Sequence, residues 1–171
     1  MKKILLTLLV SGAVSANAVT IQAVGFSGGD GSTDTALNVV LNGIKSAKST
    51  IDVSAYSFTS KPISYALIDA SKRGVKVRIV ADAKQNNRIY SAVGYTVANG
   101  IPTRLNSEYQ DFHNKFMIID SVCVETGSFN YSASAANKNA ENALIICDIG
   151  LSKAYQQQFN RWFNQGQDVS K

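Results

Sequence analysis

The chain has 171 residues, of which 45% are hydrophobic and 17% are charged, and its formal net charge is +5. This composition is that of a soluble globular protein and excludes an intrinsically disordered chain. The length suits one domain with a substantial hydrophobic core. The excess of positive charge favours a polyanionic partner but does not identify one.

Residues 1–18 have the three parts of an export signal. Met1-Lys2-Lys3 is a charged start, Ile4 to Val10 is a short apolar segment, and Ala16-Asn17-Ala18 fits a cleavage site. The apolar segment is shorter than the roughly 20 residues that span a bilayer, although an uncleaved anchor is the alternative. The sequence therefore predicts a signal peptide over residues 1–18 and a folded domain over residues 19–171. The mature protein is expected in the bacterial periplasm or medium, without stable membrane insertion.

After the leader, period-two and helical patterns alternate, which predicts an α/β fold. The elements expected in the first half are a strand at 19–24, a loop at 25–32, a helix around 37–44 capped by Asp34, a strand at 51–55, a helix from Ser60 to Gly74, a strand at 75–79, a helix around 89–97 and a short strand at 101–105.

The second half is expected to hold a hairpin, one more strand and a long helix. Residues 115–119 and 122–125 are apolar runs on either side of an Asp120-Ser121 turn. Residues 142–147 form the next strand, and a C-terminal helix with an aromatic stripe ends at Gly166. We interpret that stripe as a core or dimer contact. Together the elements predict a mixed sheet flanked by helices.

The two cysteines, Cys123 and Cys147, both fall in expected strands. An exported protein can form a disulfide, but each flanking run would also accept a buried free thiol. We favour unpaired core cysteines. Two cysteines and one histidine so far apart in the chain argue against a zinc site.

The most informative feature is a group of polar residues around the single histidine. His113, Lys115 and Asp120 have the spacing H-x-K-x(4)-D, followed by Gly127-Ser128-Phe129-Asn130 and then by Glu141. His113 and Lys115 are two residues apart, so a strand would point both to one face. An imidazole, an ammonium, a hydroxyl and an amide suit attack on a phosphodiester. The carboxylates are not clustered as a magnesium or calcium site requires, so no metal or cofactor is expected.

This pattern resembles the phospholipase D superfamily, whose signature is H-x-K-x(4)-D followed by G-S-x-N. Among its branches, the short bacterial endonucleases with one motif copy look most similar. The resemblance extends to AYSFTS before the motif and to ETGSFNYS, KNAEN and RWFNQG after it. It implies the α/β sandwich of this superfamily. It also implies an active site formed across a homodimer, since most members carry two motif copies and this chain carries one.

The resemblance gives each candidate catalytic residue a role. His113 attacks phosphorus and forms a phosphohistidine, while Glu141 holds the imidazole in the attacking tautomer. A second histidine must protonate the leaving oxygen, and a twofold dimer supplies it. Lys115, Ser128 and Asn130 donate to the phosphoryl oxygens. Asp120 lies in a turn and receives a supporting role.

The sequence thus predicts an exported, metal-independent endonuclease that cleaves DNA or RNA with little sequence preference. The alternative is a phospholipase D-type enzyme acting on lipid, because the same chemistry serves any phosphodiester. Lipid hydrolysis calls for an apolar pocket or a membrane-docking stretch, and no such stretch follows the leader. A non-catalytic binding protein is a third possibility, which the intact motif disfavours.

Overall fold

The computed structural model describes residues 19–28, 34–86 and 90–169. The expected signal peptide lies outside these residues. The helices are α1 (Ala36–Ser46), α2 (Lys61–Lys72), α3 (Ala83–Asn86), α4 (Val93–Ala98), α5 (Ala133–Asn137) and α6 (Ile149–Gln165). The strands are β1 (Thr20–Ser27), β2 (Thr50–Ala55), β3 (Lys76–Asp82), β4 (Thr103–Asn106), β5 (Lys115–Ile119), β6 (Cys123–Gly127), β7 (Glu141–Cys147) and β8 (Gln167–Asp168).

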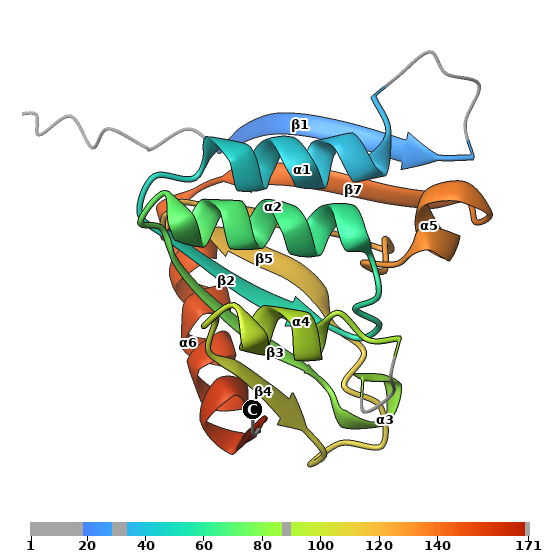
Figure 1. Cartoon of the computed structure of the whole chain (residues 1–171). Helices are drawn as coiled ribbons and strands as arrows, with labels where there is room; N and C mark the ends of the chain where they lie inside the picture. Colours follow the sequence, from blue (N-terminus) through green and yellow to red (C-terminus); the bar gives the residue numbers. More distant parts are fainter. Residues whose placement is uncertain (1–18, 29–33, 87–89, 170–171) are drawn as a thin grey trace, which may run out of the picture.

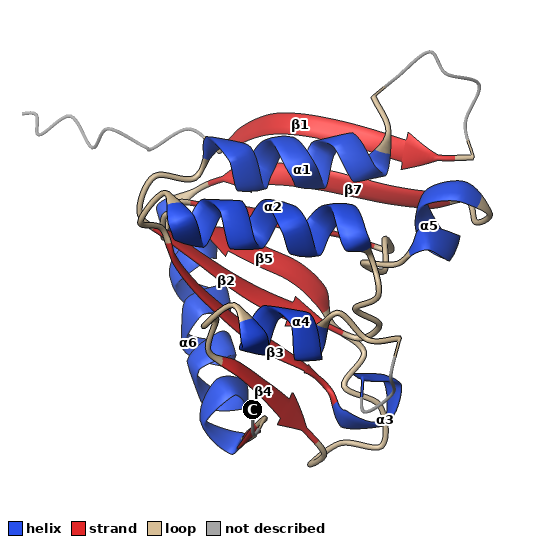
Figure 2. Cartoon of the chain, viewed as in Figure 1, coloured by secondary structure: helices blue, strands red, loops and turns tan. Residues whose placement is uncertain are grey.

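These strands form one mixed sheet in the order β1-β7-β6-β5-β2-β3-β4-β8. Strands β2, β3 and β4 run parallel to one another, and the remaining pairings are antiparallel. Helices α1, α2 and α4 cover one face of the sheet, and α6 crosses the other (Figure 1, Figure 2). The expected mixed sheet flanked by helices is confirmed.

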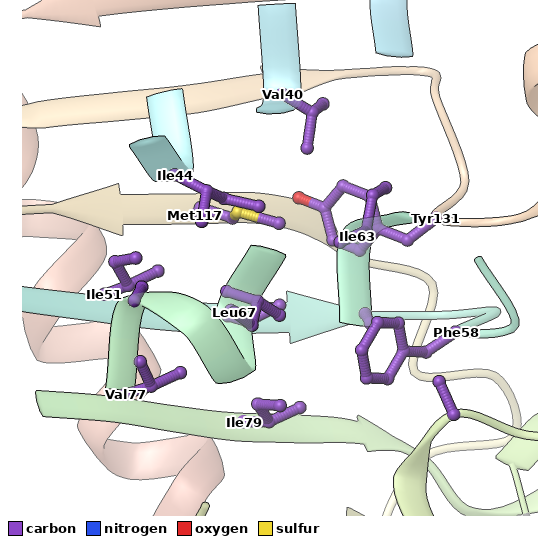
Figure 3. Packing of buried hydrophobic residues seen from close by; sticks show 14 of the residues in the cluster. Val40, Ile44, Ile51, Phe58, Ile63, Leu67, Val77, Ile79, Met117 and Tyr131 are labelled. Atoms are coloured by element: carbon purple, nitrogen blue, oxygen red, sulfur yellow. The ribbon is translucent and has the colours of Figure 1, made fainter. Parts of the chain in front are cut away.

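The larger hydrophobic core lies between the sheet and helices α1 and α2. Ile44, Leu67 and Met117 meet there and are fully buried (Figure 3). Helix α1 begins where the Thr35 hydroxyl accepts a hydrogen bond from the Asn38 amide, so Thr35 is the cap in place of the expected Asp34. Burial of each aliphatic side chain in this larger core stabilises the fold by about 1.5–3 kcal/mol.

A smaller aromatic core lies on the other face, under α6. Strand β5 contributes side chains to both cores, because Phe116 and Ile118 point to α6 while Met117 points to α1 and α2. Phe159 of α6 is completely buried, and Trp162 packs beside it. The aromatic stripe of the C-terminal helix is therefore a core contact in the single subunit.

Two expectations for the first half of the chain need correction. The segment from Gly25 to Ser27, expected as a loop, continues β1 and pairs with β7. A Cβ atom at Gly25 would lie 2.7 Å from the Thr35 carbonyl oxygen, so the glycine allows close approach of α1. The helix expected around 89–97 begins only at Val93, and a separate short helix, α3, precedes it.

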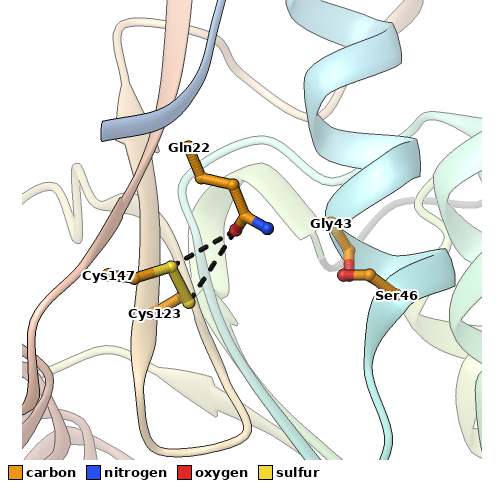
Figure 4. The surroundings of a disulfide bond; sticks show 5 residues. All are labelled: Gln22, Gly43, Ser46, Cys123 and Cys147. Atoms are coloured by element: carbon orange, nitrogen blue, oxygen red, sulfur yellow. Dashed lines mark hydrogen bonds between the residues drawn. A yellow bond between two sulfur atoms is a disulfide. The ribbon is translucent and has the colours of Figure 1, made fainter. Parts of the chain in front are cut away.

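The expectation of unpaired cysteines is wrong. Cys123 on β6 and Cys147 on β7 are opposite each other in the antiparallel register, with their Cα atoms 4.0 Å apart, and they form a disulfide (Figure 4). The Oε1 atom of Gln22 on β1 lies 3.2 Å from the Cys147 sulfur. The pairing depends on strand register, which neither flanking sequence reveals.

Candidate active site

The predicted nucleophile and cation meet at the start of β5. Lys115 is the first residue of the strand, and its Nζ lies 3.1 Å from Nδ1 of His113. Tyr56, which follows β2, supports both side chains. Its ring centroid is 4.3 Å from that of His113, and the Lys115 ammonium lies 5.0 Å from the centre of the Tyr56 ring. In the sequence, Tyr56 belongs to the segment AYSFTS, which contributed only to the family resemblance. Its contact with His113 was not predicted.

Buried Asp82 holds the segment that carries His113. The Phe112 backbone amide donates to one carboxylate oxygen of Asp82 at 2.8 Å, and the Gln85 amide donates to the other at 2.8 Å. The Phe112 ring packs edge-on against Trp162, with centroids 5.2 Å apart. The residue before the histidine is thus fixed by a charge-assisted hydrogen bond and by the aromatic core.

Buried Asn86 fixes the backbone of the segment that carries Tyr56. Its Oδ1 accepts from the Phe58 amide at 2.9 Å, and its Nδ2 donates to the Tyr56 carbonyl at 2.6 Å. Two amide hydrogen bonds in a buried setting define one orientation of this loop. The Tyr56 ring is therefore held in place against His113.

The second half of the motif begins where β6 ends. A Cβ atom at Gly127 would come within 2.2 Å of the Asn142 carbonyl oxygen, so only glycine allows β6 and β7 to approach here. Ser128 follows directly. Its hydroxyl accepts from the Asn142 amide at 3.1 Å and donates to the Glu141 carboxylate.

Glu141 contacts Ser128 and not the histidine. Within the described residues, its hydrogen bonds go to Ser128 and to Asn139, whose Nδ2 is 2.8 Å from Oε1. Among the described residues, the expected hydrogen bond from the His113 ring to the Glu141 carboxylate is not formed. The Glu141 carboxylate acts on Lys115 instead. Burial lowers the pKa of Lys115, and the negative charge of Glu141 opposes that shift.

Most side chains of the motif line an open cavity of about 470 Å³. Its lining includes His113, Lys115, Ser128, Asn130 and Glu141. The Asn130 Oδ1 atom is buried and has no hydrogen-bond partner among the described residues. The structure thus brings five of the six predicted site residues to one cavity. In the part of the chain that is described, no three His, Cys, Asp or Glu side chains are grouped as metal ligands.

Asp120 is the exception: it does not line this cavity, and the role predicted for it was a supporting one. It follows the last residue of β5, which places it roughly 17 Å from Lys115 at about 3.3 Å per residue. Its carboxylate accepts from the backbone amides of Lys48, Ser49 and Thr50 at 2.7 to 3.1 Å. Burial alone would raise the pKa of Asp120, but these hydrogen bonds outweigh burial and lower the pKa. Asp120 therefore joins the α1–β2 connection to the β5–β6 turn.

The sheet, the covering helices and this site together define a phospholipase D-like domain. Residues 40–163 match the family model described as "Cardiolipin synthase, PLD-like domain", and the chain belongs to this family of the phospholipase D superfamily.

Two solved structures are similar to the chain over most of its length. Nuc from Salmonella typhimurium, a phospholipase D family member, superposes with a TM-score of 0.84 at 40% identity, over 90% of this chain and 100% of the other. NucT from Helicobacter pylori gives a TM-score of 0.71 at 28% identity, over 78% and 91% of the two chains.

Curated relatives carry lipid names. A phospholipase D from Rickettsia conorii is 37% identical over 74% of this chain and 62% of its own length. A mitochondrial cardiolipin hydrolase from Chlamydomonas reinhardtii is 33% identical over 75% and 58% of the two lengths. The chain thus spans about three fifths of the curated relatives that it matches. Among the described residues, no helix is long and apolar enough to cross a membrane.

Proposed function

We propose that this chain is a metal-independent endonuclease that cleaves nucleic acid through a covalent phosphohistidine at His113. The observation that carries the proposal is the contact of His113 with Lys115, 3.1 Å apart, in an open cavity with the hydroxyl and amide of Ser128 and Asn130. The similarity to Nuc, a family member matched over its whole length, supports a nucleic-acid substrate.

The reaction has two displacements. A ring nitrogen of neutral His113 attacks phosphorus, the bond to the leaving oxygen breaks, and that oxygen takes a proton from the partner subunit's His113. Water then gives a proton to the partner's His113, attacks phosphorus and breaks the phosphorus–nitrogen bond. Lys115 neutralises charge on the phosphoryl oxygens during both steps, Asn130 donates a hydrogen bond to them, and the Ser128 hydroxyl does so by turning from Glu141.

The homodimer and the export of the protein are parts of the same proposal. The chain has one histidine, and the two displacements need a nucleophile and an acid at once. A twofold axis that brings two copies of His113 together satisfies that need. The N-terminal pattern of residues 1–18 supports export to the periplasm or medium, a compartment that also suits the Cys123–Cys147 disulfide.

A phospholipase is the second candidate, and one observation favours it. A mainly apolar hollow of about 290 Å³ adjoins the catalytic cavity, shares Asn114, Phe116 and Tyr155 with it, and extends to Trp162. The apolar pocket that the sequence did not reveal is therefore present, and an acyl chain fits its chemistry. The names of the curated relatives point the same way.

One experiment separates the two candidates. Purified protein is incubated with labelled DNA, RNA and vesicles of cardiolipin or phosphatidylcholine, each with and without EDTA. We expect rapid cleavage of nucleic acid that survives EDTA and is abolished in His113→Ala. Faster release of a lipid headgroup than of oligonucleotide products would favour the phospholipase. A strict requirement for a divalent cation would overturn the mechanism.

A further inference from the structure

A third hollow, also of about 290 Å³, lies away from the other two, between the start of α2 and the start of α4. We call it the tyrosine groove and define it by Thr59, Lys61, Tyr65, Tyr90, Ser91 and Tyr95. It shares no lining residue with the catalytic cavity. Three phenol rings, one ammonium and two aliphatic hydroxyls line it.

The aromatic rings of the groove are exposed, so packing of the core does not explain them. Tyr90, Tyr65 and Tyr95 are 86%, 50% and 48% exposed. Tyr65 and Tyr95 meet edge to face with centroids 5.5 Å apart, and about half of each side chain stays exposed. The side of α2 that packs on the sheet uses other residues, among them Ile63 and Leu67.

The tyrosine groove is tied to the catalytic site by one short loop. Thr59 is three residues from Tyr56, so the Cα atoms of Thr59 and Tyr56 are at most about 11 Å apart. The Tyr56 ring in turn packs on His113. The amides of Thr59 and Ser60 donate to the Tyr131 carbonyl at 2.9 and 2.8 Å, next to Asn130 of the motif.

The opposite wall of the groove is fixed to the same loop. The Ala92 amide donates to the Phe58 carbonyl at 2.8 Å, and the Ser91 hydroxyl lies 3.2 Å from Oδ1 of Asn86. Asn86 also holds the Tyr56 carbonyl. Both walls therefore have defined positions relative to His113.

We propose that the tyrosine groove binds unpaired bases of a single-stranded nucleic acid whose scissile phosphate lies in the catalytic cavity. This inference rests on the proposed endonuclease function and names its substrate class. Exposed rings stack on bases without regard to sequence, and Lys61 provides a cation for an adjacent phosphate. A duplex hides its base faces, so the groove adds affinity only for single strands.

The binding test uses the full chain with His113→Ala, so that the substrate is not cut. Fluorescent single strands, duplexes and an abasic strand of equal length are titrated by anisotropy. Tyr65→Ala with Tyr95→Ala is expected to weaken single-strand binding by at least about tenfold, the scale of one or two lost stacking contacts. Duplex and abasic-strand binding should change less than about twofold.

Matched variants isolate the ring face from other effects. Tyr65→Phe with Tyr95→Phe keeps the rings and is expected to bind single strands as the parent does. Lys61→Ala should weaken binding, whereas Lys72→Ala at the opposite end of α2 should not. Circular dichroism of each variant verifies the fold. Equal single-strand binding by the alanine and phenylalanine pairs would overturn the proposal.

Two further readouts separate this inference from the proposed function. The alanine pair made in active protein should cleave bis(p-nitrophenyl) phosphate at the parental rate but cut single strands more slowly at low concentration. Cleavage of nucleic acid that is unaffected by the alanine pair would overturn the groove alone. Cleavage of the small diester with none of nucleic acid would overturn the endonuclease. Loss of vesicle binding in place of oligonucleotide binding would assign the tyrosines to a membrane surface.

Discussion

Lys115 combines a position in the proposed active site with an unusual environment for a lysine. It is partly buried over the Tyr56 ring, and burial lowers the pKa of its ammonium while Glu141 partly restores it. A cation held in place and partly desolvated neutralises a developing phosphoryl charge better than a cation in water. The hydrogen bond from Ser128 to Glu141 keeps that balancing carboxylate nearby.

Replacement of this ammonium tests its role directly. We expect Lys115→Met to lower kcat by about 10²–10³, the scale on which one donor to a transition-state oxyanion acts. Steady-state kinetics on a labelled oligonucleotide provide the measurement, with exposed Lys72→Met as the control for loss of a positive charge. A kcat equal to that of the parent would remove Lys115 from the proposed site.

Glu125 is a titratable residue that the proposed chemistry does not use. It is 1% exposed on β6, and it accepts a hydrogen bond from the Tyr131 hydroxyl at 2.7 Å. Burial raises the pKa of Glu125 to about 8, although the hydrogen bond from Tyr131 opposes the shift. Burial together with the neighbouring carboxyl likewise raises the pKa of Tyr131. A carboxyl in this setting keeps its proton at neutral pH.

This raised pKa has a defined effect on stability. Between its ordinary value of 4.5 and about 8, the folded chain retains a proton that the unfolded chain releases. The stability contribution of Glu125 is therefore complete below pH 4.5 and is lost as the pH rises through about 8, at about 1.4 kcal/mol per pH unit. Glu125→Gln should remove this slope. Urea unfolding of both proteins from pH 5 to 8 measures it, with exposed Glu108→Gln as the control; parallel curves for Glu125→Gln and the parent would contradict the expected protonation.

Most helices and strands could be predicted from periodicity, because their apolar side chains follow the faces that the two cores bury. Sequence reasoning failed where pairing overrides local composition. Gly25 suggested a loop, yet it lies in β1. A glycine is needed there because α1 packs too closely on the strand for a side chain. The cysteines suggested two buried thiols, yet the register of β6 and β7 places them opposite each other.

The site was predictable to the extent that its residues share a motif. His113, Lys115, Ser128 and Glu141 were named from spacing, and the hairpin of β5 and β6 with β7 brings them together. Tyr56 was not assigned a role, because its contact with His113 depends on how β2 lies beside β5. That adjacency is a property of the sheet order and leaves no local signal.

The disulfide between β6 and β7 is expected to stabilise the sheet at the end of these strands that lies away from Gly127 and Glu141. It closes a loop with a sequence separation of 24, for which loss of chain entropy in the unfolded state gives about 3–4 kcal/mol. Cys123→Ser with Cys147→Ser should lower the free energy of unfolding by that amount. Denaturant curves of the double variant and of reduced parent should coincide. A loss below about 1 kcal/mol would show that the two strands hold their register without the bond.

For the whole molecule, the central expectation is a shared active site. In the proposed mechanism, a chain with one histidine needs a partner subunit to complete the pair of nucleophile and acid. A heterodimer of parent and His113→Ala, purified through two different tags, should lose nearly all activity, since a general acid or base contributes about 10²–10⁴. Independent subunits would leave half of the activity. Light scattering that finds an active monomer at assay concentration would also contradict the shared site.

The lysine and the aspartate of the H-x-K-x(4)-D motif lie at opposite ends of strand β5. At one end Lys115 faces the catalytic cavity, and at the other Asp120 joins backbone amides of a different connection. A pattern search scores these positions as a single signature, although substitutions at them have unlike consequences. A homologue that lacks the aspartate but retains the histidine and lysine should be counted among the competent enzymes, provided that its chain folds. A homologue with the reverse change would be a well-folded protein without catalysis, and the two kinds should be kept apart when functions are transferred across this superfamily.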